Sequence, residues 1–285
     1  MYIKMTIESV FLVFIFVLGL IFGSFFNVLI KRFNTGASIA GRSYCFSCNR
    51  NLSWYELMPI VSFVMQKGRC TGCQSRISWQ YPLVEFLTGF LFVAISWKFL
   101  DFNGFEIVNI LSEPLFQEKI AIIFYYIFVF SLLLIISVYD FYHKIIPDFF
   151  VYLFGLTSFI GIFVFPSVEP RLTIFLAGII LFIFFASLWA ISKGRWMGFG
   201  DAKLSLGIGW FLGMSHGVTA IVISFWIGAS FGLLLLGFGR FIQLYKATKS
   251  FTLKSEIPFG PFMALATFIT FIFEINFASL YLLFT

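Results

Sequence analysis

Long uninterrupted apolar runs are the feature that most constrains this chain. Runs of about 18 or more mainly apolar residues recur from end to end, and a helix of that length crosses roughly 30 Å of hydrocarbon. Only 11% of the 285 residues are charged, compared with roughly 25% in soluble domains. The runs are continuous instead of alternating, which favours helices over the strands of a membrane barrel. We therefore predict an all-α polytopic membrane protein.

The apolar runs and the charges between them predict a topology. We expect about eight transmembrane helices, at about 7–30, 82–100, 119–139, 148–166, 171–192, 201–214, 217–240 and 261–284. The odd-numbered loops carry 15 of the 19 Lys and Arg residues, and basic loops face the cytoplasm. Both termini are then periplasmic. The net charge of +6 follows from topology, so we expect no nucleic-acid partner.

The chain divides into three predicted parts. Residues 1–30 form a first transmembrane helix, which we expect to be retained because its apolar run is longer than that of a signal peptide. Residues 31–81 are the one hydrophilic segment of domain-like length, and the predicted topology makes them cytoplasmic. Residues 82–285 hold the remaining helices as one membrane bundle.

All four cysteines fall in the cytoplasmic segment, as two C-x-x-C pairs separated by 21 residues: Cys45, Cys48, Cys70 and Cys73. This spacing is typical of a structural zinc site with four thiolate ligands. The alternative is a pair of disulfides, which rarely persist in a reducing cytoplasm. We favour zinc, because a short segment with a small apolar core benefits from a metal.

Two acids stand at predicted cytoplasmic helix ends, Asp140 at the end of the third span and Asp201 at the start of the sixth. Two carboxylates that share a proton provide the acid and the base of an aspartic protease. The predicted membrane depth of the two acids does not by itself identify a catalytic pair. The alternative is that each Asp is an interfacial residue paired with Lys144 or Lys203. We interpret Asp148, which follows Pro147, as a helix N-cap.

The residues around Asp201 favour the catalytic interpretation. Gly198 and Gly200 flank Phe199 directly before it, and Lys203 follows. Glycines permit irregular backbone and close approach, and irregular backbone at membrane depth is tolerated where it lines a watery cavity. A protease that works inside a membrane needs such a cavity to admit water. Glu274, by contrast, has no functional interpretation.

These motifs, taken together and in order, resemble those of the prepilin peptidases, also called type IV leader peptidases. The resemblance covers essentially the whole chain. It includes the catalytic segments around Asp140 and Asp201 and the cytoplasmic segment with its cysteines. It also rests on three further motifs: Gly23-Ser24-Phe25-Phe26-Asn27-Val28-Leu29-Ile30, Tyr81-Pro82-x-x-Glu85 and Ile257-Pro258-Phe259-Gly260-Pro261.

The resemblance implies two activities in a bacterial inner membrane. One is cleavage, after a Gly, of the basic leader of type IV prepilins or pseudopilins at the cytoplasmic membrane face, with Asp140 and Asp201 as the catalytic pair. The other is N-methylation of the new terminus from S-adenosylmethionine, which the family assigns mainly to the cysteine-bearing domain. The sequence does not locate the methyl donor, for which Glu56, Gly68 and Glu85 are candidates.

Two other classes of protein remain as alternatives. One is a transporter or channel with a zinc-stabilised loop, in which Asp140 and Asp201 would be ion sites. Transporters often contain internal repeats, and none is visible in this sequence. The other is a membrane methyltransferase without protease activity.

Overall fold

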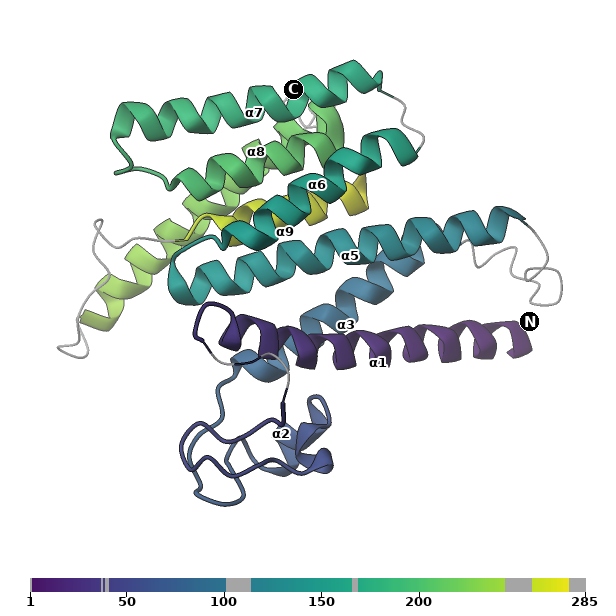
Figure 1. Ribbon diagram of the computed structural model, residues 1–285, viewed down its shortest axis with the longest axis vertical. Helices are drawn as coiled ribbons and strands as arrows, with labels where there is room; N and C mark the ends of the chain where they lie inside the picture. Colours follow the sequence, from purple (N-terminus) through teal and green to yellow (C-terminus); the bar gives the residue numbers. More distant parts are fainter. Residues whose placement is uncertain are drawn as a thin grey trace. The chain divides into compact units, whose positions relative to one another are not determined.

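The computed structural model describes residues 2–36, 38, 41–100, 114–165, 169–243 and 258–276, and within them helices are the dominant element (Figure 1). The chain forms two compact units, Met1–Ser131 and Leu132–Thr285. The division falls inside helix α5, Pro114–His143. Each unit is therefore described by itself.

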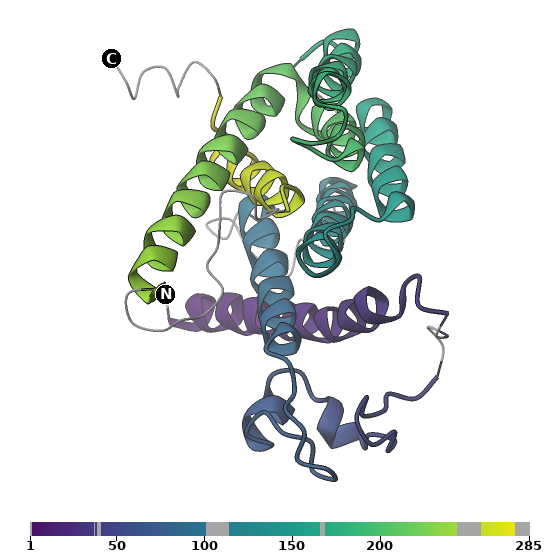
Figure 2. The ribbon, with the colours of Figure 1, turned by 90° about the vertical axis from the view of Figure 1, so that its left-hand side faces the viewer.

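The first unit is built on two long helices, α1 (Tyr2–Arg32) and α3 (Gln80–Phe99), which cross in Figure 2. Glycines set the crossing: a Cβ on Gly19 would lie 2.6 Å from the Cα of Gly89, and a Cβ on Gly23 would lie 2.6 Å from the Cα of Glu85. Small residues let helices approach closely in a membrane, where packing and not water exclusion drives association. Between α1 and α3 the chain forms a small module with a 3₁₀ helix, Trp54–Leu57, and helix α2, Val61–Met65.

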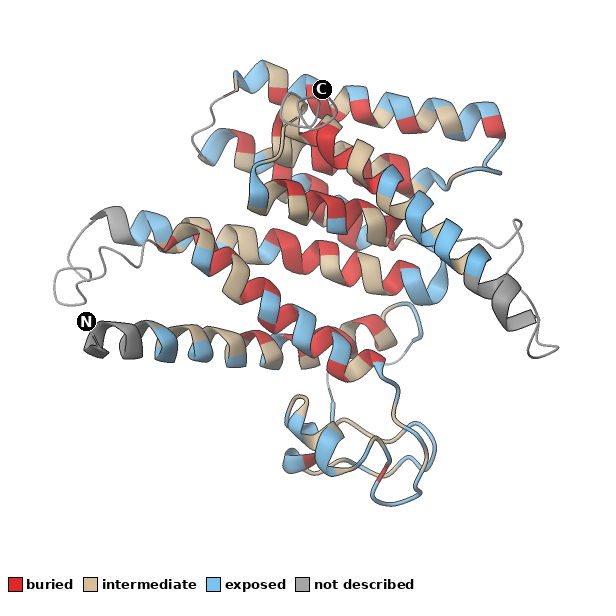
Figure 3. Cartoon of the chain, turned by 180° about the vertical axis from the view of Figure 1, so that it is seen from behind, coloured by how far each residue is buried: buried red, intermediate tan, exposed pale blue. Residues whose placement is uncertain are grey.

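The second unit packs three helices against a central one. Helix α8, Phe199–Gln243, contacts α6 (Asp148–Val164), α7 (Arg171–Ser192) and α9 (Gly260–Phe273). A Cβ on Gly209 of α8 would lie 2.6 Å from the Cα of Gly178 of α7, so their backbones meet almost directly. Buried residues gather along the helices where these pack together (Figure 3), and Phe154, Phe185 and Ile208 have no exposed surface.

Helix α8 is broken at Gly213, whose φ of 79° and ψ of −172° are not helical. Glu169, in the connection before α7, compensates for this break. Its Oε2 accepts the N–H of Met214 at 2.9 Å and its Oε1 accepts that of Ser215 at 3.2 Å. These N–H groups begin the second half of the helix and have no intrahelical acceptor. The break thus forms without leaving these two N–H groups unsatisfied.

The predicted fold class is confirmed. Five described helices are long and apolar enough to cross a membrane, and α6 and α9 are shorter apolar helices. Gly213 divides the longest of the five, so the helices correspond to the eight predicted segments. The eighth ends earlier than expected: α9 stops at Phe273 and Glu274 adopts φ 51°. Residues 277–284 of that predicted span lie outside the described residues.

The close contact of α7 with α8 yields a stability prediction. We expect Gly209→Val to lower the free energy of unfolding by about 1–3 kcal/mol, because the new side chain must push two backbones apart. Thermal unfolding in detergent would measure this change. Gly237→Val is the matched control, since nothing lies within 4 Å of a Cβ at that position of the same helix. Equal melting temperatures for the two variants would contradict this packing.

Candidate functional site

The two C-x-x-C pairs form knuckles that repeat one hydrogen-bonding pattern. The N–H of Cys45 donates to the carbonyl of Arg50 at 2.9 Å, and that of Cys70 donates to the carbonyl of Ser75, also at 2.9 Å. An isolated antiparallel bridge closes each knuckle, Tyr44 with Asn51 and Arg69 with Arg76. The two cysteine pairs are therefore presented by the same local structure.

Each knuckle turns through a left-handed residue four positions after its first cysteine. Asn49 has φ 54° and Gln74 has φ 59°, and their N–H groups donate to the carbonyls of Cys45 at 2.8 Å and Cys70 at 3.0 Å. Asn adopts this conformation more readily than most residues, so the first turn matches its sequence better than the second.

The four thiols converge on one point, because their Sγ atoms all lie within 4.8 Å of one another. The Sγ atoms of Cys45 and Cys73 are 3.8 Å apart, which is about the edge of a tetrahedron with roughly 2.3 Å metal–sulfur bonds. The N–H groups of Cys48 and Ser47 lower the pKa of the Cys45 thiol to about 6. Ser75 likewise holds the pKa of Cys73 below its usual value. Because the four sulfurs converge at this spacing, the cluster could hold a metal ion.

Glu56 ties the two knuckles together. Its Oε1 accepts hydrogen bonds from Arg50 Nη2 of the first knuckle at 2.6 Å and from Thr71 Oγ1 of the second at 2.5 Å. Its Oε2 accepts the N–H of Ser53 at 2.9 Å. The Arg50 guanidinium, helped by Thr71 and Ser53, lowers the pKa of the Glu56 carboxyl to about 2. Both carboxylate oxygens are therefore used inside the module.

The other two candidates for the methyl-donor site differ from each other. Gly68 has φ 67°, and a Cβ there would lie 3.1 Å from the ring of Phe63, so this position needs a glycine for backbone reasons. Glu85 is buried in α3, and its Oε2 accepts the N–H of Ile60 at 2.7 Å. Ile60 has φ 58°, which is strained for a β-branched residue.

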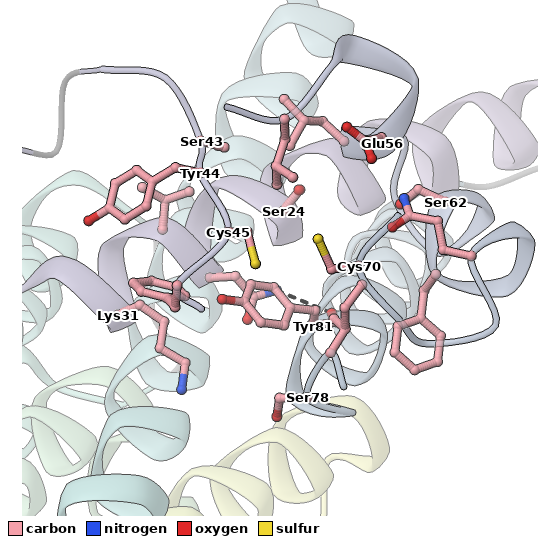
Figure 4. Close-up of a pocket in the computed structure, with 18 of the residues that line it drawn as sticks. Ser24, Lys31, Ser43, Tyr44, Cys45, Glu56, Ser62, Cys70, Ser78 and Tyr81 are labelled. Carbon is pink, nitrogen blue, oxygen red and sulfur yellow. Dashed lines mark hydrogen bonds between the residues drawn. The ribbon is translucent and has the colours of Figure 1, made fainter. Parts of the chain in front are cut away.

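Glu85 also lines a cavity of about 470 Å³ in the first unit. Three segments form its walls: the end of α1, the cysteine module and the start of α3 (Figure 4). Asn27 of α1 belongs to the lining and is fully buried. Its Nδ2 donates to the carbonyl of Tyr81 at 3.1 Å, while its Oδ1 has no hydrogen-bond partner among the described residues.

Asp140 lies in the last turn of α5 and is 4% exposed. Its Oδ2 accepts the N–H of Gly260 at 3.1 Å. Gly260 is the first residue of α9, so a helix N-terminus, which favours negative charge, meets this carboxyl. A Cβ on Gly260 would lie 2.7 Å from the same oxygen, so only glycine lets the backbone approach this closely.

Asp201 lies in the first turn of α8 and is 5% exposed. Its Oδ2 accepts the N–H of Gly198 at 3.1 Å, while its buried Oδ1 has no hydrogen-bond partner in the part of the chain that is described. Asp140 is close enough to act electrostatically on this carboxyl. The second unit thus buries both acids within electrostatic range of each other, and each has a backbone donor.

The residues around Asp201 support this arrangement in different ways. A Cβ on Gly200 would lie 2.8 Å from that of Ile146, so α8 begins directly against the segment that follows α5. Lys203 pairs with Asp148 at 2.7 Å, so its ammonium bridges α8 and α6. The predicted N-cap at Asp148 is wrong, because Pro147 is the N-cap and Asp148 is the first residue of α6.

Sequence reasoning missed the roles of Gly260 and Glu169. Gly260 belongs to a recognised motif, but its contact with Asp140 joins residues 120 positions apart, which no local pattern reveals. Glu169 lies in the connection between two apolar runs, and an acid in such a loop does not by itself indicate a structural role. A glycine at 213 after a short apolar run was the available clue to a break.

Comparisons with known proteins match both parts of the chain. The family described as the Bacterial Peptidase A24 N-terminal domain matches residues 17–99, and the Type IV leader peptidase family matches residues 127–233. A prepilin leader peptidase/N-methyltransferase of Bacillus subtilis (strain 168) is 31% identical over 269 residues, covering 94% of this chain and 96% of the relative.

Two further relatives carry the same printed name. That of Stutzerimonas stutzeri is 28% identical over 295 residues, covering 94% of this chain and 92% of the relative. That of Myxococcus xanthus (strain DK1622) is 50% identical over 90 residues, covering 31% of this chain and 27% of the relative. No solved structure matches the chain at a significant level.

The Glu56 contacts predict how the cysteine module opens. Hydrogen bonds to a charged carboxylate are stronger than those to a neutral amide, so Glu56→Gln weakens the contacts that join the two knuckles. The module should then open more often, and we expect trypsin to cleave after Lys67 and Arg69 about fivefold faster. Timed digestion followed by mass spectrometry would measure the rate. Glu118→Gln, which removes an exposed acid of α5, should leave the rate unchanged. Equal rates in all three proteins would show that Glu56 does not hold the knuckles together.

Proposed function

This chain belongs to the type IV leader peptidase family, and we propose that it cleaves the basic leader from type IV prepilins or pseudopilins and then N-methylates the new N-terminal residue. The alignment of the chain with nearly the whole of a relative of that name supports this proposal. The observation that supports the protease activity is that the second unit buries both Asp140 and Asp201, near enough for one carboxyl to act electrostatically on the other. Each carboxyl is oriented by the N–H of a glycine.

We propose that Asp140 and Asp201 activate one water molecule for attack on the scissile carbonyl. Two neighbouring carboxylates do not ionise together easily and share a proton. The ionised one takes a proton from water, and the protonated one gives a proton to the leaving amine. Asp201 Oδ1, which has no hydrogen-bond partner among the described residues, is available for the water. Lys203 contributes by bridging the helix ends and not by contacting the pair.

For the second activity we propose S-adenosylmethionine as methyl donor and zinc as a structural ion. Cys45, Cys48, Cys70 and Cys73 would hold the zinc, since their sulfurs fit a tetrahedral site and four thiolates leave no open position. When bound, the zinc would crosslink the two knuckles. Residues 31–81 are then the methyl-transfer domain, 1–30 the first transmembrane helix and 82–285 the protease bundle. This functional division is separate from the compact units, which divide inside α5.

The setting of both reactions is the bacterial inner membrane, in which the apolar helices make this a multi-pass protein. We propose periplasmic termini, which place the cysteine module and the helix ends bearing Asp140 and Asp201 on the cytoplasmic side. The substrates would be prepilins held in the membrane by their apolar stems, so lipid is the other partner. The basic residues of the cytoplasmic loops would attract anionic headgroups.

We expect Asp140→Asn and Asp201→Asn to reduce cleavage at least about 10³-fold, since a lost acid or base removes the proton transfers that the mechanism needs. A synthetic prepilin peptide, followed by mass spectrometry, would measure cleavage. Methylation of a pre-cleaved peptide should stay within about twofold. Glu118→Gln, which removes an exposed acid of α5, is the control and should cleave the peptide at the wild-type rate.

A transporter or channel would give a different outcome for the same variants. Processing would then persist in both Asp variants, and flux across vesicles would be lost instead. A membrane methyltransferase without protease activity would methylate the pre-cleaved peptide and leave intact prepilin uncut in the wild type.

The cysteine cluster predicts one zinc ion per chain. We expect elemental analysis of the purified protein to find it and Cys70→Ser to lose it, because three thiolates hold zinc less tightly than four. Cleavage after Lys67 and Arg69 by trypsin should then accelerate, while Asp140 and Asp201 keep their backbone donors. Zinc-free wild-type protein with a protease-resistant module would contradict the assignment.

A further inference from the structure

We propose that the 470 Å³ cavity of the first unit binds the methyl donor, with Glu85 facing its positive charge. The inference rests on the methyl-transfer part of the proposed function and locates its site. The volume falls in the range of small-molecule pockets, roughly 300–1,000 Å³. The cavity lies against the cysteine module, with Cys45 and Cys70 among its lining residues (Figure 4).

The lining offers a partner for each part of S-adenosylmethionine. The donor carries a sulfonium, which suits a carboxylate, and Glu85 provides a buried one. It carries a carboxylate, which suits Lys31 and Arg76 among the lining residues. Its adenine suits the aromatic rings that line the same space: Tyr44, Phe46, Phe63 and Tyr81.

Two groups in this cavity are held in place by the fold itself. The N–H of Ile60 fixes the Glu85 carboxyl by a hydrogen bond to its Oε2 at 2.7 Å. Ile60 makes its contact from a strained backbone conformation, and such strain concentrates at functional sites. The buried Oδ1 of Asn27 has no hydrogen-bond partner among the residues that the structure describes, and a buried acceptor without a donor costs free energy. A ligand with amino and hydroxyl groups offers donors.

Glu56 lines the cavity too, but it is not the group that receives the donor. Arg50, Thr71 and the N–H of Ser53 already occupy its oxygens. Of the three candidates suggested by sequence, Glu85 is therefore the one with a binding role, while Glu56 and Gly68 shape the module around it.

The transfer itself needs no further reactant. The ammonium of the new N-terminus first gives one proton to solvent. The resulting amine takes the methyl group as the carbon–sulfur bond breaks, the sulfur keeps the bonding pair, and the product leaves as S-adenosylhomocysteine. Glu85 acts in binding and is not required to carry the proton.

The first test locates the donor directly. Ultraviolet irradiation of the purified full-length protein with tritiated S-adenosylmethionine should crosslink a residue of the cavity lining, with Tyr44 and Tyr81 as the expected positions, identified by mass spectrometry. Excess S-adenosylhomocysteine should prevent the labelling. A label that is competed away but maps outside residues 24–85 would overturn the inference and leave the proposed function standing.

The second test measures affinity. Titration with S-adenosylhomocysteine and S-adenosylmethionine should show that Glu85→Gln weakens binding of the cationic donor by about tenfold more than binding of the neutral product, since one opposed charge is lost. Prepilin cleavage should stay within about twofold, and Glu118→Gln should bind like the wild type. Equal weakening of both ligands by Glu85→Gln would contradict the role given to its charge.

A cavity-filling variant covers the case in which Glu85→Gln fails to fold. Ser62→Met places a longer apolar side chain at the cavity wall, and it should abolish binding of both ligands while zinc content and cleavage persist. Normal binding by this variant would overturn the inference. A wild-type protein that binds neither ligand yet cleaves prepilin would overturn it as well, together with the methyl-transfer function, and would leave the protease function intact.

Discussion

The hydrogen bonds from glycine N–H groups to two buried aspartates are the interaction on which the second unit depends. A buried carboxylate is costly at membrane depth unless something satisfies it. Asp140 lies at a helix C-terminus, where the helix dipole disfavours negative charge, and the N-terminus of α9 at Gly260 compensates. This explains why α9 begins where it does and why its first residue has no side chain.

The same need for satisfied backbone groups explains the irregular parts of the bundle. The break at Gly213 frees N–H groups at the start of the second half of α8, and Glu169 accepts two of them. The cysteine module solves a related problem outside the membrane. Its core is too small to be stable alone, so thiols, bridges and the Glu56 contacts replace apolar packing. In both places an acidic side chain supports irregular backbone.

Local pattern predicted the elements well, while contacts between distant residues were not predictable. The long apolar runs predicted the helices, because each run must cover the same hydrocarbon thickness. The C-x-x-C spacing predicted that the four thiols lie within reach of one ion. Asp140 and Asp201 remain proposed catalytic residues, now with a shared location. The partners of Glu56, Glu85 and Asp140 lie between three and 120 positions away. Such pairings follow from tertiary packing, which a single sequence does not specify.

The two proposed activities use residues that do not overlap, and this has a consequence for their order. The donor cavity is lined by residues of the first unit and the aspartates belong to the second. Cleavage must come first, since methylation needs the amine that cleavage exposes. The product is still anchored by its apolar stem, so its new terminus stays at the membrane surface where it was made. The new N-terminus would then reach the proposed donor cavity by moving along the membrane surface only. A chain that carries both sites shortens this search.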